Sequence, residues 1–500
     1  MTPLSNVMKG AALRVSETDN VATALVEIAA GSIIECGGLA VRAAAAIPRG
    51  HKIALGSIAA GEPVRKYGFP IGRATAPIAP GDHVHSHNLA TMLGTDGAIA
   101  IEPAAPLAMQ ASARSFMGYH RADGRVGTRN ELWVLPTVGC VARTAQKIAA
   151  RAAARHEGRV DGIHAFTHPF GCSQLGDDLA GTRAILAALA SHPNAAGVLF
   201  VGLGCESNQL SALLETIPPE MHAKVRHLSS QMAGDEVSEG VALLDELADD
   251  AAAAVRTPAG LDKLVLGTKC GGSDGLSGLT ANPLVGRISE AVTIAGGRAI
   301  LSEIPEIFGG EPTLFSRAAT PDVVEAGIQL VARFKRYFTD HGEPVSENPS
   351  PGNIAGGITT LEEKSLGAVQ KAGRASLTDV LPYGGRVRRN GLTLLEAPGN
   401  DAVSSTALTA AGATIILFTT GRGTPLGFPA PTMKIASNHA LAERKPDWID
   451  FDASIVLDQG VDTAAEALLD TVIAIASGQP TAAERNDERE IAIWKRGVTL

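Results

Sequence analysis

Short apolar runs alternate with longer stretches of helical periodicity over most of this chain. We predict strands for the apolar runs at residues 133–138, 162–167 and 197–202. The helices predicted to follow them span residues 141–156, 178–191 and 208–216. Strands that alternate with helices in this way are typical of a parallel sheet.

The same alternation continues to the end of the chain. Further strands are predicted at residues 264–266, 298–302, 393–396 and 414–418, and further helices at 235–258, 283–296, 321–338 and 462–477. Residues 348–367, by contrast, are polar and rich in glycine, and they predict a long loop. The larger part of the chain is therefore predicted to be an α/β body with mainly parallel sheets.

The first hundred residues have a different pattern. The motif Ile-x-x-Gly-x-x-(Val/Ile) occurs four times, beginning at Ile28, Ile47, Ile58 and Ile78. Each copy predicts a turn with glycine at its tip that leads into a short strand. The repeat therefore indicates a small, compact all-β module, to which residues 21–30 are expected to add one short helix.

These patterns divide the chain into four parts. The all-β module is expected to span residues 1–97, and an Ala/Pro-rich linker residues 98–115. Two α/β domains are expected to follow, at residues 116–260 and 261–500.

Composition narrows the class of protein further. Hydrophobic residues make up 45% of the chain, enough for full-sized cores, and the 55 glycines suit many tight strand–helix turns. The net charge of −9 argues against a general nucleic-acid-binding surface. No secretory signal or bilayer-spanning run is visible, and the five cysteines form no disulfide framework. We therefore expect a cytoplasmic protein that contacts neither nucleic acid nor membrane.

Four of the five cysteines stand directly after predicted strands. They are Cys140, Cys172, Cys205 and Cys270, and the first three follow a glycine. If the strands are parallel neighbours, all four thiols emerge at one carboxyl edge, where open α/β sheets bind ligands. Metal ligation at a shared site is one interpretation. The alternative is that these are ordinary buried cysteines.

The loop that carries Cys270 holds further polar groups. It contains Ser273 and Asp274 in a glycine-rich turn between a strand and a helix, and such turns expose backbone N–H groups to anions. Glu303 and Glu306 follow the next predicted strand. Paired carboxylates can bind metal or move protons, although they can also cap neighbouring helices.

Histidines mark the end of the N-terminal module. His83, His85 and His87 share one face if this segment is a strand. Three imidazoles on one face suit a divalent metal or proton transfer, and a solvated edge strand is the alternative. Lys66, in a constrained turn nearby, either meets a carboxylate or is exposed.

Three other loops carry candidate ligand-binding groups. Arg129 ends a polar segment that holds several arginines, whose forked guanidinium groups suit carboxylates. Asn353 lies in the long polar loop, which is rich in groups that could hold sugar hydroxyls. Arg422 and Thr424 belong to a Gly-Arg-Gly-Thr turn that lets a ligand approach the backbone.

Several of these segments together resemble the altronate/galactarate dehydratase family, and the resemblance covers essentially the whole chain. The segments are Lys66-Tyr-Gly-Phe-Pro-Ile-Gly72, His83-Val-His-Ser-His-Asn88, Gly171-Cys-Ser-Gln-Leu-Gly-Asp-Asp178, Gly202-Leu-Gly-Cys-Glu206, Cys270-Gly-Gly-Ser-Asp-Gly275 and Gly421-Arg-Gly-Thr-Pro425. The resemblance implies an N-terminal β-clip module of the SAF type joined to a large α/β body.

It also implies a hydro-lyase that converts D-altronate to 2-dehydro-3-deoxy-D-gluconate with the help of Fe²⁺ or Mn²⁺, in hexuronate breakdown. On this basis His85, His87, Lys364 and Asp274 are the catalytic candidates. Lys66, Arg129, Ser273, Asn353, Arg422 and Thr424 are the substrate-binding candidates. His85, His87 and the four strand-end cysteines are the metal-ligand candidates.

Three alternatives remain open at this point. An iron–sulfur cluster on the strand-end cysteines could replace the single metal ion, although no local Cys-x-x-Cys spacing supports it. The substrate could be galactarate or a related sugar acid. The chain could also bind a sugar acid without transforming it. Its partner is in each case a small sugar acid, and we expect a homo-oligomer.

Overall fold

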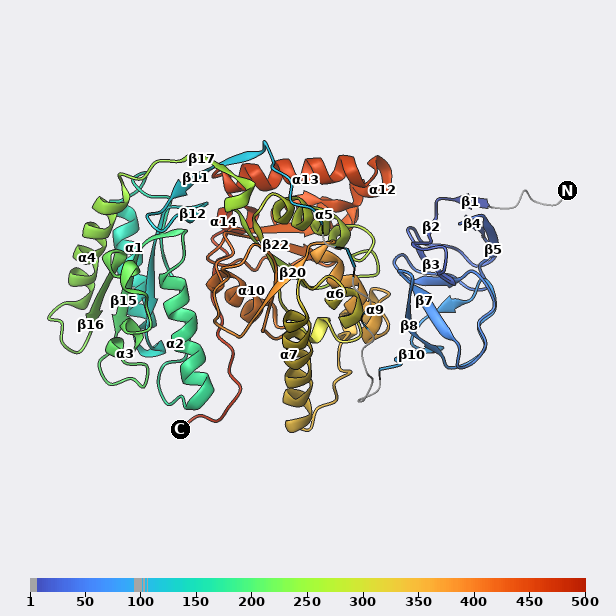
Figure 1. Ribbon diagram of the computed structural model, residues 1–500, viewed down its shortest axis with the longest axis horizontal. Helices are drawn as coiled ribbons and strands as arrows, with labels where there is room; N and C mark the ends of the chain where they lie inside the picture. The colour runs from blue at the N-terminus through green and yellow to red at the C-terminus, as the bar shows by residue number, and fades with distance from the viewer. Residues whose placement is uncertain (1–6, 94–100, 102–103, 106) are drawn as a thin grey trace.

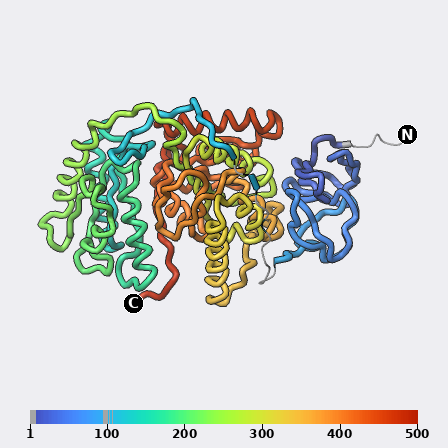
Figure 2. The backbone as a smooth tube through the Cα atoms, in the orientation of Figure 1, coloured from blue at the N-terminus to red at the C-terminus, as the bar shows by residue number. Residues whose placement is uncertain are grey.

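The computed structural model describes residues 7–93, 101, 104–105 and 107–500. Three domains lie in a row (Figures 1 and 2). The N-terminal domain lies at one end and the domain next to it in the sequence lies at the other. The C-terminal domain lies between them, so it contacts both neighbours. Part of the predicted linker, residues 98–100, 102–103 and 106, falls outside the described residues.

The N-terminal domain is built entirely from short strands. They are β1 (Val7–Lys9), β2 (Ala12–Leu13), β3 (Val21–Ala24), β4 (Ile33–Cys36), β5 (Leu39–Arg42), β6 (Lys52–Ala54), β7 (Pro63–Lys66), β8 (Phe69–Ala74), β9 (His83–Val84) and β10 (Leu89–Ala90). They form three small sheets, in the orders β1-β4-β5, β10-β8-β7 and β2-β3-β6-β9. The predicted all-β module is confirmed.

The fourfold repeat organises this domain in pairs. Ile28 forms an antiparallel bridge with Ile47, and Ile58 with Ile78. All four isoleucine side chains are buried, and the glycine three residues after each has a positive φ. The short helix predicted at residues 21–30 is wrong, because β3 pairs with both β2 and β6 and draws this segment into a sheet.

The middle domain contains a four-stranded parallel sheet in the order β14-β13-β15-β16. Its strands are β13 (Glu131–Pro136), β14 (Gly162–Ala165), β15 (Ala195–Gly202) and β16 (Val225–Ser229). Its helices are α1 (Ala142–Arg155), α2 (Gly176–Ala190), α3 (Leu210–Leu214) and α4 (Glu236–Ala251). Strand β16 was not predicted.

The two faces of this sheet are buried differently. Helices α1 and α4 cover one face and enclose a core with Leu132, Val134 and Leu199. The other face, with Trp133 and Phe200, joins α2 and the hydrophobic core of the C-terminal domain. A small antiparallel sheet of β11 (Ser115–His120), β12 (Val126–Gly127) and β17 (Thr257–Gly260) joins the start and the end of this domain.

The C-terminal domain contains a seven-stranded parallel sheet in the order β20-β21-β19-β18-β22-β23-β24. Its strands are β18 (Val265–Cys270), β19 (Arg298–Leu301), β20 (Leu377–Leu381), β21 (Gly391–Leu395), β22 (Ile415–Thr420), β23 (Thr432–Ala436) and β24 (Phe451–Asp452). The parallel sheets predicted for the α/β body are confirmed, although β20, β23 and β24 were not predicted.

The helices of this domain are α5 (Ala281–Ile294), α6 (Glu311–Phe315), α7 (Pro321–Asp340), α8 (Pro351–Ala355), α9 (Leu361–Ala368), α10 (Asp401–Ala410), α11 (His439–Arg444), α12 (Val456–Gln459), α13 (Val461–Ala476) and α14 (Ala482–Arg485). The long loop predicted at residues 348–367 is therefore wrong in part. Ser350 and Thr360 each cap a helix there through the side-chain oxygen, so both α8 and α9 begin within that segment.

Two sets of buried ion pairs hold the C-terminal segment against the middle domain. Arg489 pairs with Glu131 at 2.8 Å, and Arg129 pairs with Glu484 at 2.8 Å. Within the described ranges, no helix is long and apolar enough to cross a membrane.

Candidate active site

The N-terminal domain docks on the C-terminal domain through a buried group of three charges. Lys52 and Lys66 lie 2.8 and 3.0 Å from the two carboxylate oxygens of Glu363 in α9. Burial alone would raise the pKa of Glu363, but the two ammonium groups lower it to about 2. Lys66 therefore meets a protein carboxylate, and its ammonium group is engaged in joining the two domains.

The backbone contact beside this ion group is close. A Cβ atom at Gly275 would collide with the carbonyl oxygen of Gly50, and one at Gly357 would collide with the same atom. The N–H of Gly275 donates to the carbonyl of Gly356 at 2.7 Å. The loop after β18 and the end of α8 thus form the surface on which the N-terminal domain lies.

Four histidines gather at this junction. The imidazole of His83 has its centre 5.1 Å from that of His51, 5.3 Å from that of His85 and 5.6 Å from that of His87. The strand predicted to align them ends at Val84, and a turn brings the rings together instead. His87 is exposed, whereas the other three are partly or fully buried.

The C-terminal domain orients two of these rings. His51 and His85 stack at 4.8 Å, and their Nε2 atoms lie 3.3 and 3.0 Å from the carbonyls of Ala355 and Ile354. Burial lowers the pKa of both imidazoles, and burial with the neighbouring rings lowers that of His83 to about 4. The three rings are therefore neutral near pH 7, which is the form that binds metals.

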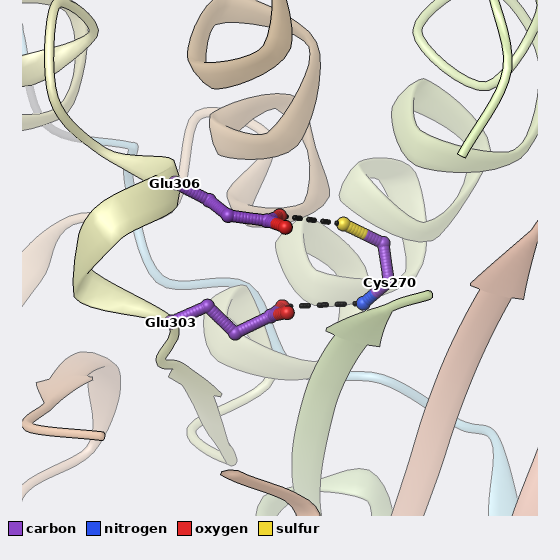
Figure 3. Close-up of side chains that lie close together, drawn as sticks. All are labelled: Cys270, Glu303 and Glu306. Carbon is purple, nitrogen blue, oxygen red and sulfur yellow. Dashed lines mark hydrogen bonds between the residues drawn. The ribbon is translucent and has the colours of Figure 1, made fainter. Parts of the chain in front are cut away.

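A second polar group lies at the carboxyl end of β18 (Figure 3). The thiol of Cys270 donates to Glu306 at 2.9 Å, and its backbone N–H donates to Glu303 at 3.2 Å. Both glutamates belong to the turn after β19, where Glu303 has a left-handed backbone with φ of 67°. That rarely populated conformation is characteristic of functional sites.

Three buried lysines surround this group. Lys269 contacts Glu303 and lies 2.9 Å from Asp401. The Nζ of Lys371 lies 2.8 Å from the Cys270 sulfur and 3.0 Å from Glu303, and that of Lys364 lies 3.1 Å from Glu306. Three ammonium groups thus face the carboxylates of Glu303, Glu306 and Asp401, which balances the charge.

The buried charges fix each other's protonation state. Burial would raise the pKa of Glu306, but Lys364 and Lys371 lower it to about 2. Although burial opposes this, the nearby thiol and carboxylates raise the pKa of Lys364 and Lys371. Burial, together with Glu306, raises the pKa of the Cys270 thiol. The group thus contains charged lysines, an ionised Glu306 and a neutral Cys270 thiol at pH 7.

Cys270, Glu303 and Glu306 form a group that could hold a metal ion, since their ligand atoms lie within 4.8 Å of one another. One thiol and two carboxylates are donors that iron and manganese accept. Each donor is already paired with a lysine, however, so a metal ion here would have to displace ammonium groups.

A cavity of about 580 Å³ opens beside this group. Cys270, Glu306, Asn353, Lys364 and Asp401 are among the residues that line it. It lies at the carboxyl edge of the seven-stranded sheet, where parallel sheets place their ligand sites. One wall is therefore strongly charged, and its charges are held in place by burial.

Two of the predicted residues, Asn353 and Lys364, line this cavity, and both contact Ser273. Lys364 donates to the Ser273 hydroxyl at 2.9 Å, and Asn353 donates to the Ser273 carbonyl at 2.8 Å. All three side chains are buried. Arg422 is exposed and donates to the carbonyl of Gly352, also near α8. Ser273 and Arg422 come from the loops after β18 and β22, whereas Asn353 and Lys364 belong to helices α8 and α9.

Two further predicted residues have mainly local contacts. The Asp274 carboxylate accepts hydrogen bonds from Ser277, Ser437 and Asn438, which leaves it fully engaged in shaping its own turn. Thr424 is half-buried, and its hydroxyl accepts from the N–H of Leu426. Arg129 lies outside the cavity and pairs with Glu484 between domains.

The prediction that four cysteines share one sheet edge is wrong. Cys270 follows β18 in the seven-stranded sheet, whereas Cys140, Cys172 and Cys205 follow β13, β14 and β15 in the four-stranded sheet. These three thiols are exposed, and Cys270 is buried. The pattern of a strand followed by Gly-Cys does not reveal which sheet a strand joins.

The three exposed thiols still come from neighbouring loops. The N–H of Gly139 donates to the carbonyl of Phe170 at 2.8 Å, and that of Asn208 donates to the carbonyl of Gly171 at 2.9 Å. A Cβ at Gly171 would collide with the carbonyl oxygen of Thr137. The loops that carry Cys140, Cys172 and Cys205 are therefore in direct backbone contact.

Lys269, Lys371 and His51 were not predicted from the sequence. Lys371 is seven residues after Lys364, which is a helical spacing that places both on one face, and this signal could have identified it. His51 follows the glycine in the second copy of the isoleucine repeat. Lys269 directly precedes Cys270, but a lysine inside an apolar strand gives no indication of its partner.

Comparison with known proteins gives matches along nearly the entire chain. Residues 10–92 match the altronate/galactarate dehydratase SAF domain. Residues 118–252 match the second domain of D-galactarate dehydratase/altronate hydrolase. Residues 261–499 match the C-terminal domain of D-galactarate/altronate dehydratase.

Individual relatives match over similar lengths. The chain is 46% identical to an altronate dehydratase of Bacillus subtilis, over 98% of this chain and 99% of the relative. It is 47% identical to an altronate dehydratase of Escherichia coli, also over 98% and 99%. A galactarate dehydratase (L-threo-forming) of Escherichia coli is 31% identical over 93% of each chain.

Proposed function

This chain belongs to the D-galactarate/altronate dehydratase family, and we propose that it removes water from D-altronate to give 2-dehydro-3-deoxy-D-gluconate. The observation that carries the proposal is the similarity to two altronate dehydratases, at 46% and 47% identity over 98% of the chain. The lower identity of 31% to a galactarate dehydratase favours altronate over galactarate.

The reaction has two chemical requirements. A base must remove the weakly acidic proton at C2, and an acid must protonate the hydroxyl that leaves from C3. Negative charge develops on the substrate carboxylate as the C2 proton departs, so fixed cations beside that carboxylate accelerate the reaction. The enol that forms then rearranges to the 2-keto acid.

We assign the charge-stabilising role to Lys364. Its ammonium group lines the cavity, is buried, and remains protonated because its pKa is raised. Glu306, ionised and on the same wall, is the proposed acceptor of the C2 proton, and in its protonated form it passes that proton to the C3 hydroxyl, which leaves as water. Ser273, Asn353 and Arg422 supply hydrogen-bonding groups for the substrate carboxylate and hydroxyls.

We propose that the junction histidines hold Fe²⁺ or Mn²⁺, which when bound would polarise the substrate carboxylate and hydroxyl. Nδ1 of His51 and Nε2 of His83 lie 3.0 Å apart. Two adjacent ligands on one octahedral ion are separated by about the same distance, since each lies about 2.1 Å from the ion. His85 and His87 complete the candidate set.

Backbone carbonyls support this assignment over the Cys270 group. The Nε2 atoms of His51 and His85 contact the carbonyls of Ala355 and Ile354, a backbone contact that metal-bound histidines often make. Nδ1 of His51 then faces His83, and Nδ1 of His85 lies 3.0 Å from the Ser86 hydroxyl. Among the described residues, no lysine hydrogen-bonds these imidazoles, whereas three lysines surround Cys270. Because the imidazoles of His51, His83 and His85 are neutral near pH 7, a metal ion can bind them without displacing a charged group.

An iron–sulfur cluster on Cys140, Cys172 and Cys205 is the second candidate for the metal centre. The observation in its favour is that three exposed thiols come from three loops in backbone contact. Visible absorption and acid-labile sulfide in anaerobically purified protein distinguish it from a single ion. Colour and sulfide that disappear in Cys205→Ser, but persist in Cys36→Ser, would identify a cluster.

The function is tested with a panel of sugar acids assayed for 2-keto acid formation. D-altronate is expected to react at least about tenfold faster than galactarate, in terms of kcat/KM, with Fe²⁺ or Mn²⁺ present. A faster reaction with galactarate would replace the substrate but keep the chemistry. Binding of the sugar acids without product, in protein loaded with either metal, would show a non-catalytic protein.

A further inference from the structure

A second cavity, of about 540 Å³, lies between the middle and C-terminal domains. Arg298 lines it from the first position of β19, Asn390 from directly before β21, and Thr414 from directly before β22. These positions mark the amino edge of the seven-stranded sheet. The candidate active site lies at the opposite, carboxyl edge, so a ligand in this cavity is separate from the substrate.

The cavity is positive in a chain that is negative overall. Five cationic residues line it, namely Arg125, Arg298, Arg386, Arg388 and Lys263. Three acidic residues do so, namely Asp123, Glu220 and Asp262. Five positive and three negative charges leave an excess of two positive charges, whereas the whole chain carries −9.

Pairing among these residues leaves three arginines and Glu220, which together carry the excess of two positive charges. Arg125 donates to Asp123 at 2.8 Å, and Lys263 lies 3.1 Å from Asp262. The Nε of Arg298 is buried without a hydrogen-bond partner. Among the residues that the structure describes, Arg386 and Arg388 have neither a hydrogen bond nor an ion pair through their guanidinium groups.

The arginines also repel one another. Burial, followed by the charges of Arg125 and Arg388, lowers the pKa of Arg386. Burial lowers the pKa of Arg298; the charge of Asp262 opposes this shift and that of Arg125 adds to it. Glu220 and Asp123 oppose the shift at Arg386, as Asp262 does at Arg298, but three acidic side chains do not neutralise five cations. The remaining repulsion costs free energy, and a bound anion would remove that cost.

We propose that this cavity binds a small dianion, such as a phosphate monoester or a dicarboxylate, in contact with both domains. The excess of two positive charges matches the charge of the ligand, and guanidinium groups bind both phosphate and carboxylate through paired hydrogen bonds. Arg125 comes from the middle domain, and Arg298, Arg386 and Arg388 come from the C-terminal domain. The ligand therefore strengthens the contact between these two domains.

The test uses the full chain, with inorganic phosphate and a four-carbon dicarboxylate as probes in isothermal titration calorimetry. At least one probe is expected to bind with one site per chain and to raise Tm above the value in chloride of equal ionic strength. In the Arg386→Gln/Arg388→Gln variant, binding of that probe should weaken at least about tenfold. Arg388→Gln alone serves if the double variant does not fold.

A neighbouring arginine provides a matched control. Arg389 lies between two residues that line the cavity, but it points to Asp379 and the carbonyl of Thr378 instead. The Arg389→Gln variant should therefore bind the probe within about twofold of the unchanged protein. The proposal is overturned if neither probe binds, or if Arg389→Gln and the Arg388 variants weaken binding equally.

Discussion

The carboxyl edges of the four-stranded and seven-stranded sheets share one sequence pattern but differ in the side chains that surround their cysteines. At both edges a strand leads into a glycine-flanked cysteine. In the seven-stranded sheet, Cys270 is buried among three lysines and three carboxylates. In the four-stranded sheet, Cys140, Cys172 and Cys205 are exposed.

The difference comes from what lies over each edge. The N-terminal domain and helices α8 and α9 cover the edge that carries Cys270, and they bring His51, Lys52 and Lys364 with them. Burial then fixes which of these groups are charged, as the lowered pKa of Glu306 illustrates. The chemistry of a strand-end cysteine is thus decided by its neighbours in space.

Replacing Lys364 by Met is expected to have the largest effect. Turnover of D-altronate should fall by about 10³-fold, because the fixed positive charge beside the developing negative charge is lost. The assay is 2-keto acid formation, and circular dichroism verifies the fold. Lys147→Met, at an exposed position of helix α1 in the middle domain, is the matched control. Turnover within tenfold of the unchanged protein would remove Lys364 from the mechanism.

Replacing Glu363 by Gln tests whether its ion pairs hold the N-terminal domain over the carboxyl edge of the seven-stranded sheet. It leaves Lys52 and Lys66 buried without their counterion, which should lower the free energy of unfolding by about 3 kcal/mol. Urea unfolding followed by circular dichroism measures this change. Glu325→Gln, at an exposed position of α7, should change it by less than about 0.5 kcal/mol. Equal effects of the two substitutions would show that the buried ion group does not join the domains.

The contact between the middle and C-terminal domains should weaken in acid. Burial opposes ionisation of Glu131, but Arg489 lowers its pKa to about 2 from an ordinary value of 4.5. Because the folded pKa is the lower one, this stabilisation is complete above about pH 4.5 and is lost as the pH falls towards 2.

Thermal unfolding measured between pH 6 and pH 3 checks this expectation. Glu131→Gln should lower Tm at pH 6 and flatten its dependence on pH, since the titrating group is gone. A variant with the same steep loss of Tm in acid as the unchanged protein would point to other carboxylates.

The smallest effect is expected at the exposed thiols. With a single metal ion at the histidines, Cys205→Ser should keep turnover within about twofold, whereas Cys270→Ser should lower it about tenfold or more. Parallel assays of the two variants with added Fe²⁺ measure the contrast. Loss of turnover in Cys205→Ser, together with loss of visible absorption, would reverse the assignment in favour of a cluster.

Local patterns predicted most of the elements but few of the contacts. The isoleucine repeat indicated the β module because each copy encodes its own turn, and Ile28, Ile47, Ile58 and Ile78 are all buried. Residues 21–30 misled because β3 is a strand only by virtue of its pairing with β2 and β6. Neither pairing is visible in a local window.

The candidate site was predictable where a motif concentrates polar side chains beside glycines. Ser273, Asn353 and Lys364 come together as the motifs indicated, although their roles stay predictions. Lys269 and His51 were missed because a lone lysine or histidine is defined by its spatial partners, whereas the spacing of Lys371 from Lys364 was a signal that went unused. Lys66 and Arg129 were assigned to substrate, but protein carboxylates already hold their charges.

The close approach of Gly50 to Gly275 has a consequence for how this family can vary. Each glycine belongs to a different domain, and a methyl group on Gly275 would overlap the backbone of the other chain segment. A substitution at Gly275 therefore requires a compensating change in the N-terminal domain around Gly50. Chimaeras that exchange the N-terminal domain between relatives should assemble only when both partners retain bare backbone at this point of contact.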